Sequence, residues 1–168
     1  MPSEPKLPFD PIERASAIWD RHIGESRSMR LATSIMRVQQ LISSELDAAL
    51  KPFGITFARY EVLQLISFSS AGRLPLSKIG ERLMVHPTSV TNAMDRLESQ
   101  GLVRRVADET DRRRTFAELT DEGERVLAQS TAAVMDIDFA VVGLDASQQD
   151  EAYELLRHVR QASGDFSD

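Results

Sequence analysis

The chain has 168 residues, of which 42% are hydrophobic and 27% are charged, and its formal net charge is −6 at pH 7. This composition indicates a folded globular protein, with room for one domain or a small domain plus an oligomerisation element. Cysteine is absent, which excludes disulfides, thiolate metal sites and cysteine-based redox chemistry. No apolar run reaches the ~18 residues of a membrane span and no secretory signal is recognisable, so we expect a cytoplasmic protein without a membrane partner.

The charge is unevenly distributed along the chain. From Arg73 to Arg114 there are nine Arg/Lys and six Asp/Glu, a balance of +3, whereas the remainder holds eleven basic and twenty acidic residues, a balance of −9. Phosphate recognition responds to the local field within a Debye length of about 8–10 Å. An acidic body with a basic face is therefore compatible with nucleic-acid binding, although +3 is also an ordinary surface balance.

Two helices are predicted in the N-terminal part of the chain. Residues 1–10 contain three prolines and predict a mobile tail. The Asp-Pro pair that follows predicts a helix start, and Gly24 predicts its end. A longer amphipathic helix is predicted over 28–50, where apolar residues recur three or four positions apart. We assign 11–51 to this helical region.

The central segment has the order helix, turn, helix, strand, basic loop, strand. A short helix is predicted from Leu76 to Leu83, and Pro87 begins a second helix that ends at Gly101. Two alternating runs then flank the loop ADETDRRR. This order predicts a winged helix-turn-helix over 52–119, a fold that places one helix in a DNA major groove and a basic hairpin on the backbone beside it.

Helices are predicted again after the hairpin, over 120–168. Thr120 and the two acidic residues behind it predict a capped helix that reaches about Val142, and a last helix is predicted over 146–161. The apolar stripes of the terminal helices exceed what a winged helix of about 70 residues can cover. A second copy of the chain would cover them, although the terminal helices could also pack on each other within one chain.

The predicted fold class is therefore mostly α with a small β-hairpin wing (α+β), a winged helix-turn-helix with N- and C-terminal dimerisation helices. A two-fold symmetric dimer also suits DNA, because two recognition helices one turn apart (~34 Å) match a palindromic operator. The leading prediction is a homodimeric repressor of double-stranded DNA. The alternative is a winged helix used for protein contacts without an operator.

Small polar side chains stand between the core-facing positions of the second central helix. Hydroxyl and amide groups can reach base edges and phosphates, and the positive end of the helix dipole favours phosphate. The same residue types also favour any helix start, but the preceding helix and the basic hairpin behind it favour DNA recognition. The predicted DNA contacts are Thr88, Ser89, Thr91, Asn92, Arg96, Arg112, Arg113 and Arg114.

The hairpin loop combines arginines with aspartates. Arginine at a hairpin tip suits a narrow minor groove and phosphate contacts, although a solvated charged turn has the same composition. Asp108 and Asp111 would cancel much of a general attraction for DNA. We expect them instead to form an ion pair that holds one arginine in a set pose.

With these residues in view, the chain resembles the MarR family of bacterial transcription regulators over about residues 28–161. Asp111-Arg112-Arg113, five residues and Leu119-Thr120 match the family's wing pattern D-x-R-x5-L-T, and 90–103 is similar to its recognition helix. The resemblance implies an obligate homodimer and a repressor released by a small, often anionic or phenolic, effector. It also implies Arg113 as the wing-tip residue, with Asp111 or Asp108 as its partner.

The chain departs from this family at a few positions. Met84 stands where many such motifs have glycine, and His86 replaces a serine-like cap. An extra N-terminal helix with Trp19 resembles a subset that responds to urate-like ligands, but Ala93 stands where such a ligand would need an arginine. An effector site is expected where the helices at 28–50 and 56–69 meet the recognition module. Its candidate contacts, each more often a surface residue than a ligand contact, are Trp19, His22, Arg30, Arg37, Arg59, Tyr60 and Arg105.

An enzyme is not expected. His22, His86 and His158 lie on different predicted elements and lack the spacing of a metal site. The sequence contains no cysteine nucleophile, no Gly-rich phosphate loop and no G-x-S-x-G elbow. We therefore expect no catalytic residues, no metal and no cofactor.

Overall fold

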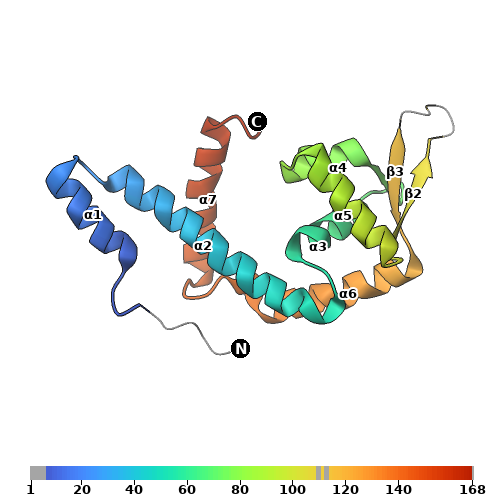
Figure 1. Cartoon of the computed structure of the whole chain (residues 1–168), viewed down its shortest axis with the longest axis horizontal. Coiled ribbons are helices and arrows are strands. Elements are labelled where there is room, and N and C mark those ends of the chain that lie inside the picture. Colours follow the sequence, from blue (N-terminus) through green and yellow to red (C-terminus); the bar gives the residue numbers. More distant parts are fainter. Residues whose placement is uncertain (1–6, 109–110, 112–113, 168) are drawn as a thin grey trace.

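The computed structural model describes residues 7–108, 111 and 114–167, which form helices around one small sheet. Figure 1 shows a compact lobe built by α3, α4, α5 and the sheet, from which the long helix α2 leads away toward α1. The predicted fold class, mostly helical with a small wing, is confirmed. The elements are α1 (Pro11–His22), α2 (Arg27–Leu50), η1 (Lys51–Phe53), α3 (Phe57–Ser67), β1 (Arg73–Pro75), α4 (Leu76–Leu83), α5 (Pro87–Ser99), β2 (Val103–Ala107), β3 (Thr115–Leu119), α6 (Asp121–Asp136), η2 (Asp138–Ala140) and α7 (Ala146–Ala162).

Polar caps begin several of the helices, as their sequences predict. The Asp10 carboxylate accepts the N–H groups of Ile12 and Glu13 at 2.8 and 3.3 Å at the start of α1. The Thr120 hydroxyl accepts the N–H of Gly123 at 3.0 Å at the start of α6. Such a cap satisfies donors that have no partner within the helix and stabilises it by about 1 kcal/mol.

The core joins the end of α2 to the helices of the lobe. Each fully buried Leu, Ile or Met side chain stabilises the fold by roughly 1.5–3 kcal/mol. Since Val90, Met94 and Leu97 are all buried, α5 is held to the lobe by the face that its spacing predicted. The largest fully buried apolar side chains are Leu46, Leu50, Leu63, Ile66, Ile79, Met94, Leu97 and Val134.

The sheet has three antiparallel strands in the order β1-β3-β2. The predicted hairpin is present, with Val103 opposite Leu119 and Ala107 opposite Thr115. The strand β1 was not predicted, because three residues are too few to show alternation. It forms by pairing with the other edge of β3, where Arg73 lies opposite Glu118.

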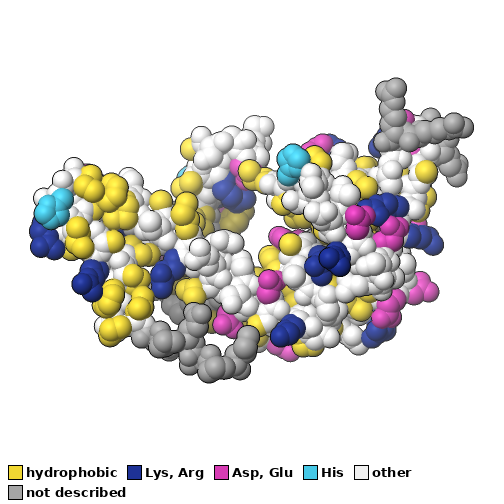
Figure 2. All heavy atoms as spheres, in the orientation of Figure 1, with side chains coloured by type: hydrophobic (Ala, Val, Ile, Leu, Met, Phe, Trp, Pro, Cys, Tyr) yellow, Lys and Arg dark blue, Asp and Glu magenta, His cyan; other side chains and the backbone are white. Residues whose placement is uncertain are grey.

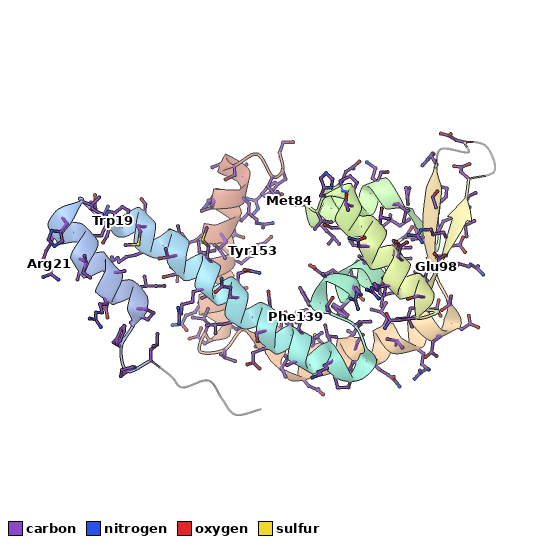
Figure 3. The ribbon with its side chains drawn as sticks, in the orientation of Figure 1. Trp19, Arg21, Met84, Glu98, Phe139 and Tyr153 are labelled. Carbon is purple, nitrogen blue, oxygen red and sulfur yellow. The ribbon has the colours of Figure 1, made fainter. Side chains whose placement is uncertain are left out.

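The connection between α6 and α7 corrects the prediction of a helix that reaches Val142. The helix α6 ends at Asp136, and η2 follows, in which Asp138, Phe139 and Ala140 all have positive φ angles of 48°, 49° and 60°. This conformation costs an L-residue roughly 1–2 kcal/mol. Phe139, labelled in Figure 3, and Ala140 pack against the core, which offsets the strain and turns the chain toward α7.

The terminal helices leave apolar side chains uncovered within one copy of the chain. Helix α7 contains no buried residue along its described length. Figure 2 shows hydrophobic side chains gathered over α1 and the neighbouring part of α2. The exposed apolar residues on α1, α2 and α7 include Ile18, Trp19, Leu31, Met36, Val38, Leu41, Tyr153, Leu155, Leu156 and Val159. Every described helix is nevertheless too short or too polar to span a membrane.

Candidate nucleic-acid interface

The exposed face of α5 carries all five of the DNA contacts that were predicted for this helix. Because the opposite face is buried in the lobe, these side chains share the solvent side and lie mostly in the first two turns. The Thr91 hydroxyl donates to the carbonyl oxygen of Pro87 at 3.1 Å, which leaves its lone pairs available. The five exposed residues are Thr88, Ser89, Thr91, Asn92 and Arg96.

The start of α5 is capped by a ring nitrogen. His86 Nδ1 accepts the N–H of Thr88 at 3.2 Å, and Pro87 occupies the first helical position. The imidazole therefore supplies the acceptor that a serine-like hydroxyl would otherwise supply. Met84, two residues earlier, has a positive φ of 52° and ends α4 in the left-handed conformation where glycine is preferred. Together these residues set the angle between α4 and α5.

The base of the wing is ordered by Asp108. Its carboxylate lies 3.8 Å from the guanidinium of Arg114 and accepts the N–H of Asp111 at 3.2 Å. The Arg114 guanidinium also lies over the ring of Phe116, 5.3 Å from its centroid. Arg112 and Arg113 lie outside the described residues, so the pairing of Arg113 that the resemblance implies stays a prediction.

An ion-paired cluster that the sequence analysis missed joins the wing to α5. The Arg105 guanidinium donates to Asp95 Oδ1 at 2.6 Å and to Glu98 Oε2, and its Nη2 lies 3.5 Å from the carbonyl oxygen of Thr91. Burial alone lowers the pKa of Arg105, but the hydrogen bonds and charges of Asp95 and Glu98 raise it above the ordinary value. In Figure 3, Glu98 lies near the end of α5 that adjoins the sheet.

The sequence contains a signal for this cluster. Asp95 and Glu98 are three residues apart, so they share one face of the helix, and β2 begins shortly after the helix ends. Arg105, near the start of that strand, lies within reach of both carboxylates. The single positive charge of Arg105 offsets part of the negative charge of Asp95 and Glu98, which reduces the repulsion between this helix and phosphate.

Arg59, one of the predicted effector contacts, lies beside α5. It lines a polar hollow of about 610 Å³ together with four residues of α5, Asn92, Asp95, Arg96 and Ser99. Two arginines from different helices therefore border the same hollow. This arrangement adds Arg59 to the basic groups near the candidate DNA contacts.

The structure does not bring the seven predicted effector contacts together. Trp19 and His22 lie on α1, and Arg30 and Arg37 are exposed on α2. Tyr60 is buried, and its hydroxyl lies 3.2 Å from that of Thr131. None of the seven lines the cavity of about 930 Å³ that α2, α3 and α7 border. As contacts of one common site the seven therefore remain an untested prediction.

The helices α4 and α5 form a helix-turn-helix, which the antiparallel hairpin β2–β3 follows and a three-stranded sheet supports. This arrangement defines a winged helix-turn-helix protein. Comparison with known proteins identifies its family. Residues 55–115 match the model of the MarR family. The chain belongs to the MarR family of transcriptional regulators, which confirms the resemblance and the expectation of a regulator rather than an enzyme.

Relatives in several bacteria support this assignment. The crystal structure of Sco5413, a MarR family transcriptional regulator from Streptomyces coelicolor, is 49% identical, covers 84% of this chain and 99% of its own, and has a TM-score of 0.78. Sco3205 from the same organism, solved in complex with DNA, is 26% identical over 82% of this chain and 91% of its own, with a TM-score of 0.74. The transcriptional regulator MhqR of Bacillus subtilis is 28% identical over 79% of this chain and 91% of its own.

Proposed function

We propose that this regulator binds double-stranded DNA by placing the N-terminal half of α5 in the major groove and the β2–β3 wing on the adjacent backbone. The observation that carries the proposal is the exposed polar face of α5 beside the ordered base of the wing. Small side chains allow a helix to enter a groove about 12 Å wide, and Asn92 offers the amide that reads adenine. The relative Sco3205, solved in complex with DNA, supports the same role here.

The regulator acts as a homodimer in this proposal. The exposed apolar residues of α1, α2 and α7 provide the surface, since α7 buries no residue within its own chain. Stable interfaces bury roughly 1,200–2,000 Å² in total, which paired helices of this length can supply. Two-fold symmetry would present two copies of α5 to successive major grooves, so the operator would be palindromic.

Repression released by a small effector completes the proposed function. An effector weakens DNA binding if it has a higher affinity for a dimer whose two α5 helices have the wrong separation. The cavity bordered by α2, α3 and α7 lies next to the helices that would set this separation. The resemblance implies an anionic or phenolic effector.

Fluorescence anisotropy with a duplex from upstream of the protein's own gene tests the DNA proposal. We expect tight binding relative to a scrambled duplex, with an affinity that falls steeply as salt rises. Asn92→Ala should lower the affinity by about 1–3 kcal/mol on the specific duplex, and Arg96→Ala should reduce the salt slope by about 1. Arg125→Ala, which removes a charge from α6, is the matched control and should leave both unchanged.

The outcomes of this experiment separate the proposals. Equal effects of Arg96→Ala and Arg125→Ala would place α5 away from the phosphates and overturn the assigned interface. If the wild-type protein did not distinguish the two duplexes at any salt concentration, a winged helix used for protein contacts would replace the operator-binding function.

Sedimentation velocity tests the dimer. Leu155→Glu adds a charge to the exposed apolar face of α7, so we expect it to dissociate the dimer at micromolar concentration and to weaken DNA binding as a consequence. Glu154→Gln, on the neighbouring position, should remain dimeric. A wild-type protein that sediments as a folded monomer would refute the dimer.

A further inference from the structure

The polar hollow of about 610 Å³ lies on the solvent side of α5. Four of its five lining residues, Asn92, Asp95, Arg96 and Ser99, follow one another at intervals of three, one and three positions, so they form one stripe along the helix. This stripe lies opposite the face of α5 that is buried in the lobe. The fifth residue is Arg59 of α3. The apolar surface of the proposed dimer lies on α1, α2 and α7, so the lining of the hollow does not include the side chains that the dimer covers.

Two arginines of the hollow have unused guanidinium groups. Among the described residues, no hydrogen bond, ion pair or ring contact reaches the guanidinium group of Arg59 or Arg96. Arg104, Arg105 and Arg114, by contrast, each lie against a carboxylate. Arg59 is also half-buried, and a partly desolvated cation without a counter-ion is costly. An anion in the hollow would offset that cost and would accept from donors that the fold leaves unused.

The acidic residue of the lining, Asp95, is already ion-paired. Its Oδ1 accepts from Arg105 at 2.6 Å, and Glu98 shares the same guanidinium. Arg59, Arg96 and Arg105 together carry +3. The two carboxylates carry −2, so the balance is +1. The hollow therefore suits an anion with one negative charge and several acceptor oxygens, which is the chemistry of a phosphodiester.

The position of Arg96 along α5 matches the DNA backbone. Ser89 and Arg96 are seven residues apart, which corresponds to about 10 Å along a helix. The major groove is about 8.5 Å deep. When the N-terminal half of α5 enters the groove as proposed, Arg96 therefore lies near the rim of the groove, where the phosphates are.

We propose that the hollow between α3 and α5 binds one backbone phosphate of the operator, with Arg59 and Arg96 donating to it from two helices. This inference rests on the proposed DNA-binding function and adds to it a residue, Arg59, that belongs neither to the helix-turn-helix nor to the wing. Leu63 and Ile66 bury the other side of α3 in the core of the lobe. A phosphate held by both helices would therefore fix the angle at which α5 enters the groove, without reading the sequence.

Fluorescence anisotropy with the duplex from upstream of the protein's own gene tests the role of Arg59. Arg59→Ala should weaken binding about fivefold on this duplex and on the scrambled duplex, and should reduce the salt slope by about 1, because a phosphate contact does not depend on sequence. Arg59→Lys keeps the charge and should keep the salt slope. Arg125→Ala, which removes an arginine charge from α6, is the matched control and should change neither the affinity nor the slope.

Duplexes that contain a single neutral methylphosphonate linkage test whether the two arginines share one phosphate. The linkage is moved one position at a time along each strand. We expect one position at which neutralisation weakens the wild-type protein but does not weaken Arg59→Ala further, and the same position should remove the effect of Arg96→Ala. If the two arginines responded to different positions, the shared site would be rejected.

The remaining outcomes distinguish this inference from the proposed function. If the wild-type protein bound the specific and the scrambled duplex equally, the proposed function itself would fail. If the wild-type protein distinguished them and Arg59→Ala bound as tightly as the wild type, only this inference would fail. Because the Arg59 guanidinium has no partner among the described residues, Arg59→Ala should unfold at the wild-type urea midpoint. A clearly lower midpoint would assign Arg59 a structural role and overturn the inference.

Discussion

Arg105 of β2 is bound to Glu98 of α5 through both its backbone and its side chain. Its N–H donates to Glu98 Oε1 at 3.1 Å, and its Nη1 donates to Oε2 of the same carboxylate. The same guanidinium also donates to Asp95 one turn earlier. Arg105 therefore contacts two successive turns of α5. The placement of the wing relative to α5 depends on these contacts.

Replacing Arg105 with Lys should reduce DNA affinity by about fivefold, the equivalent of about 1 kcal/mol. Lysine keeps the charge but lacks the planar fork that reaches two carboxylates at once. Anisotropy titrations measure the loss. Arg104→Lys, on the other face of β2 and bound to Glu118 of the neighbouring strand, should have no effect. If the Arg105→Lys variant bound DNA with wild-type affinity, only the charge at position 105 would matter.

Gly123→Ala should destabilise the protein by roughly 2–3 kcal/mol. A Cβ at this position of α6 would lie 1.9 Å from the carbonyl oxygen of Leu102, which is backbone and cannot rotate away. That carbonyl also accepts the N–H of Thr120 at 3.1 Å, so the clash would act on the junction of α6 with the sheet. Urea unfolding measures the change, with exposed Glu124→Ala as the control. Equal urea midpoints for the two variants would contradict the close packing of α6 on the turn at Leu102 that precedes β2.

Met84→Gly should stabilise the protein by about 1 kcal/mol, because glycine adopts the left-handed conformation without the steric cost that methionine has. Met84 is 76% exposed, so little apolar contact is lost. Thermal unfolding should show an increase of a few degrees. The same substitution at Met36, inside α2, should destabilise by about 1 kcal/mol. A shift of the same sign at both positions would rule out backbone conformation as the cause.

Glu61→Gln should stabilise the protein at pH 7 and have no such effect below pH 4. Burial raises the folded-state pKa above the ordinary value of 4.5, so the folded protein binds the proton more tightly than the unfolded chain does. Stability attributable to Glu61 is therefore fully present below pH 4.5 and is lost as pH rises through the folded pKa. Because the group is partly solvated, we expect a gain below about 1 kcal/mol. Urea unfolding at both pH values measures it, and a gain of equal size at pH 4 would refute the electrostatic origin.

Much of the fold follows from local patterns in the sequence. The three- and four-residue spacing of Val90, Met94 and Leu97 predicts which face of α5 is buried, and burial of that face leaves the polar residues exposed. Thr120 predicts the start of α6 because a cap is a contact between residues three apart. Such features need no knowledge of distant parts of the chain.

The features that were missed depend on distant partners. The strand β1 exists because β3 offers an edge whose paired residues are 41 to 45 positions away in the sequence, and its own three residues contain no pattern. The positive φ angles of η2 are tolerated because Phe139 and Ala140 pack against the core, an effect that no local propensity predicts. The place of Arg59 beside α5 likewise follows from how two helices pack and not from its own segment of sequence.

By itself the sequence determined the order of the main helices and the hairpin, the buried side of α5 and the family, because periodicity, caps and the wing motif are local and do not depend on how the parts are arranged. Only the tertiary structure decided that Arg105 meets Asp95 and Glu98, and that the Tyr60 hydroxyl lies beside that of Thr131. These relationships arise when separate elements pack together, and packing fixes distances that sequence spacing alone does not contain.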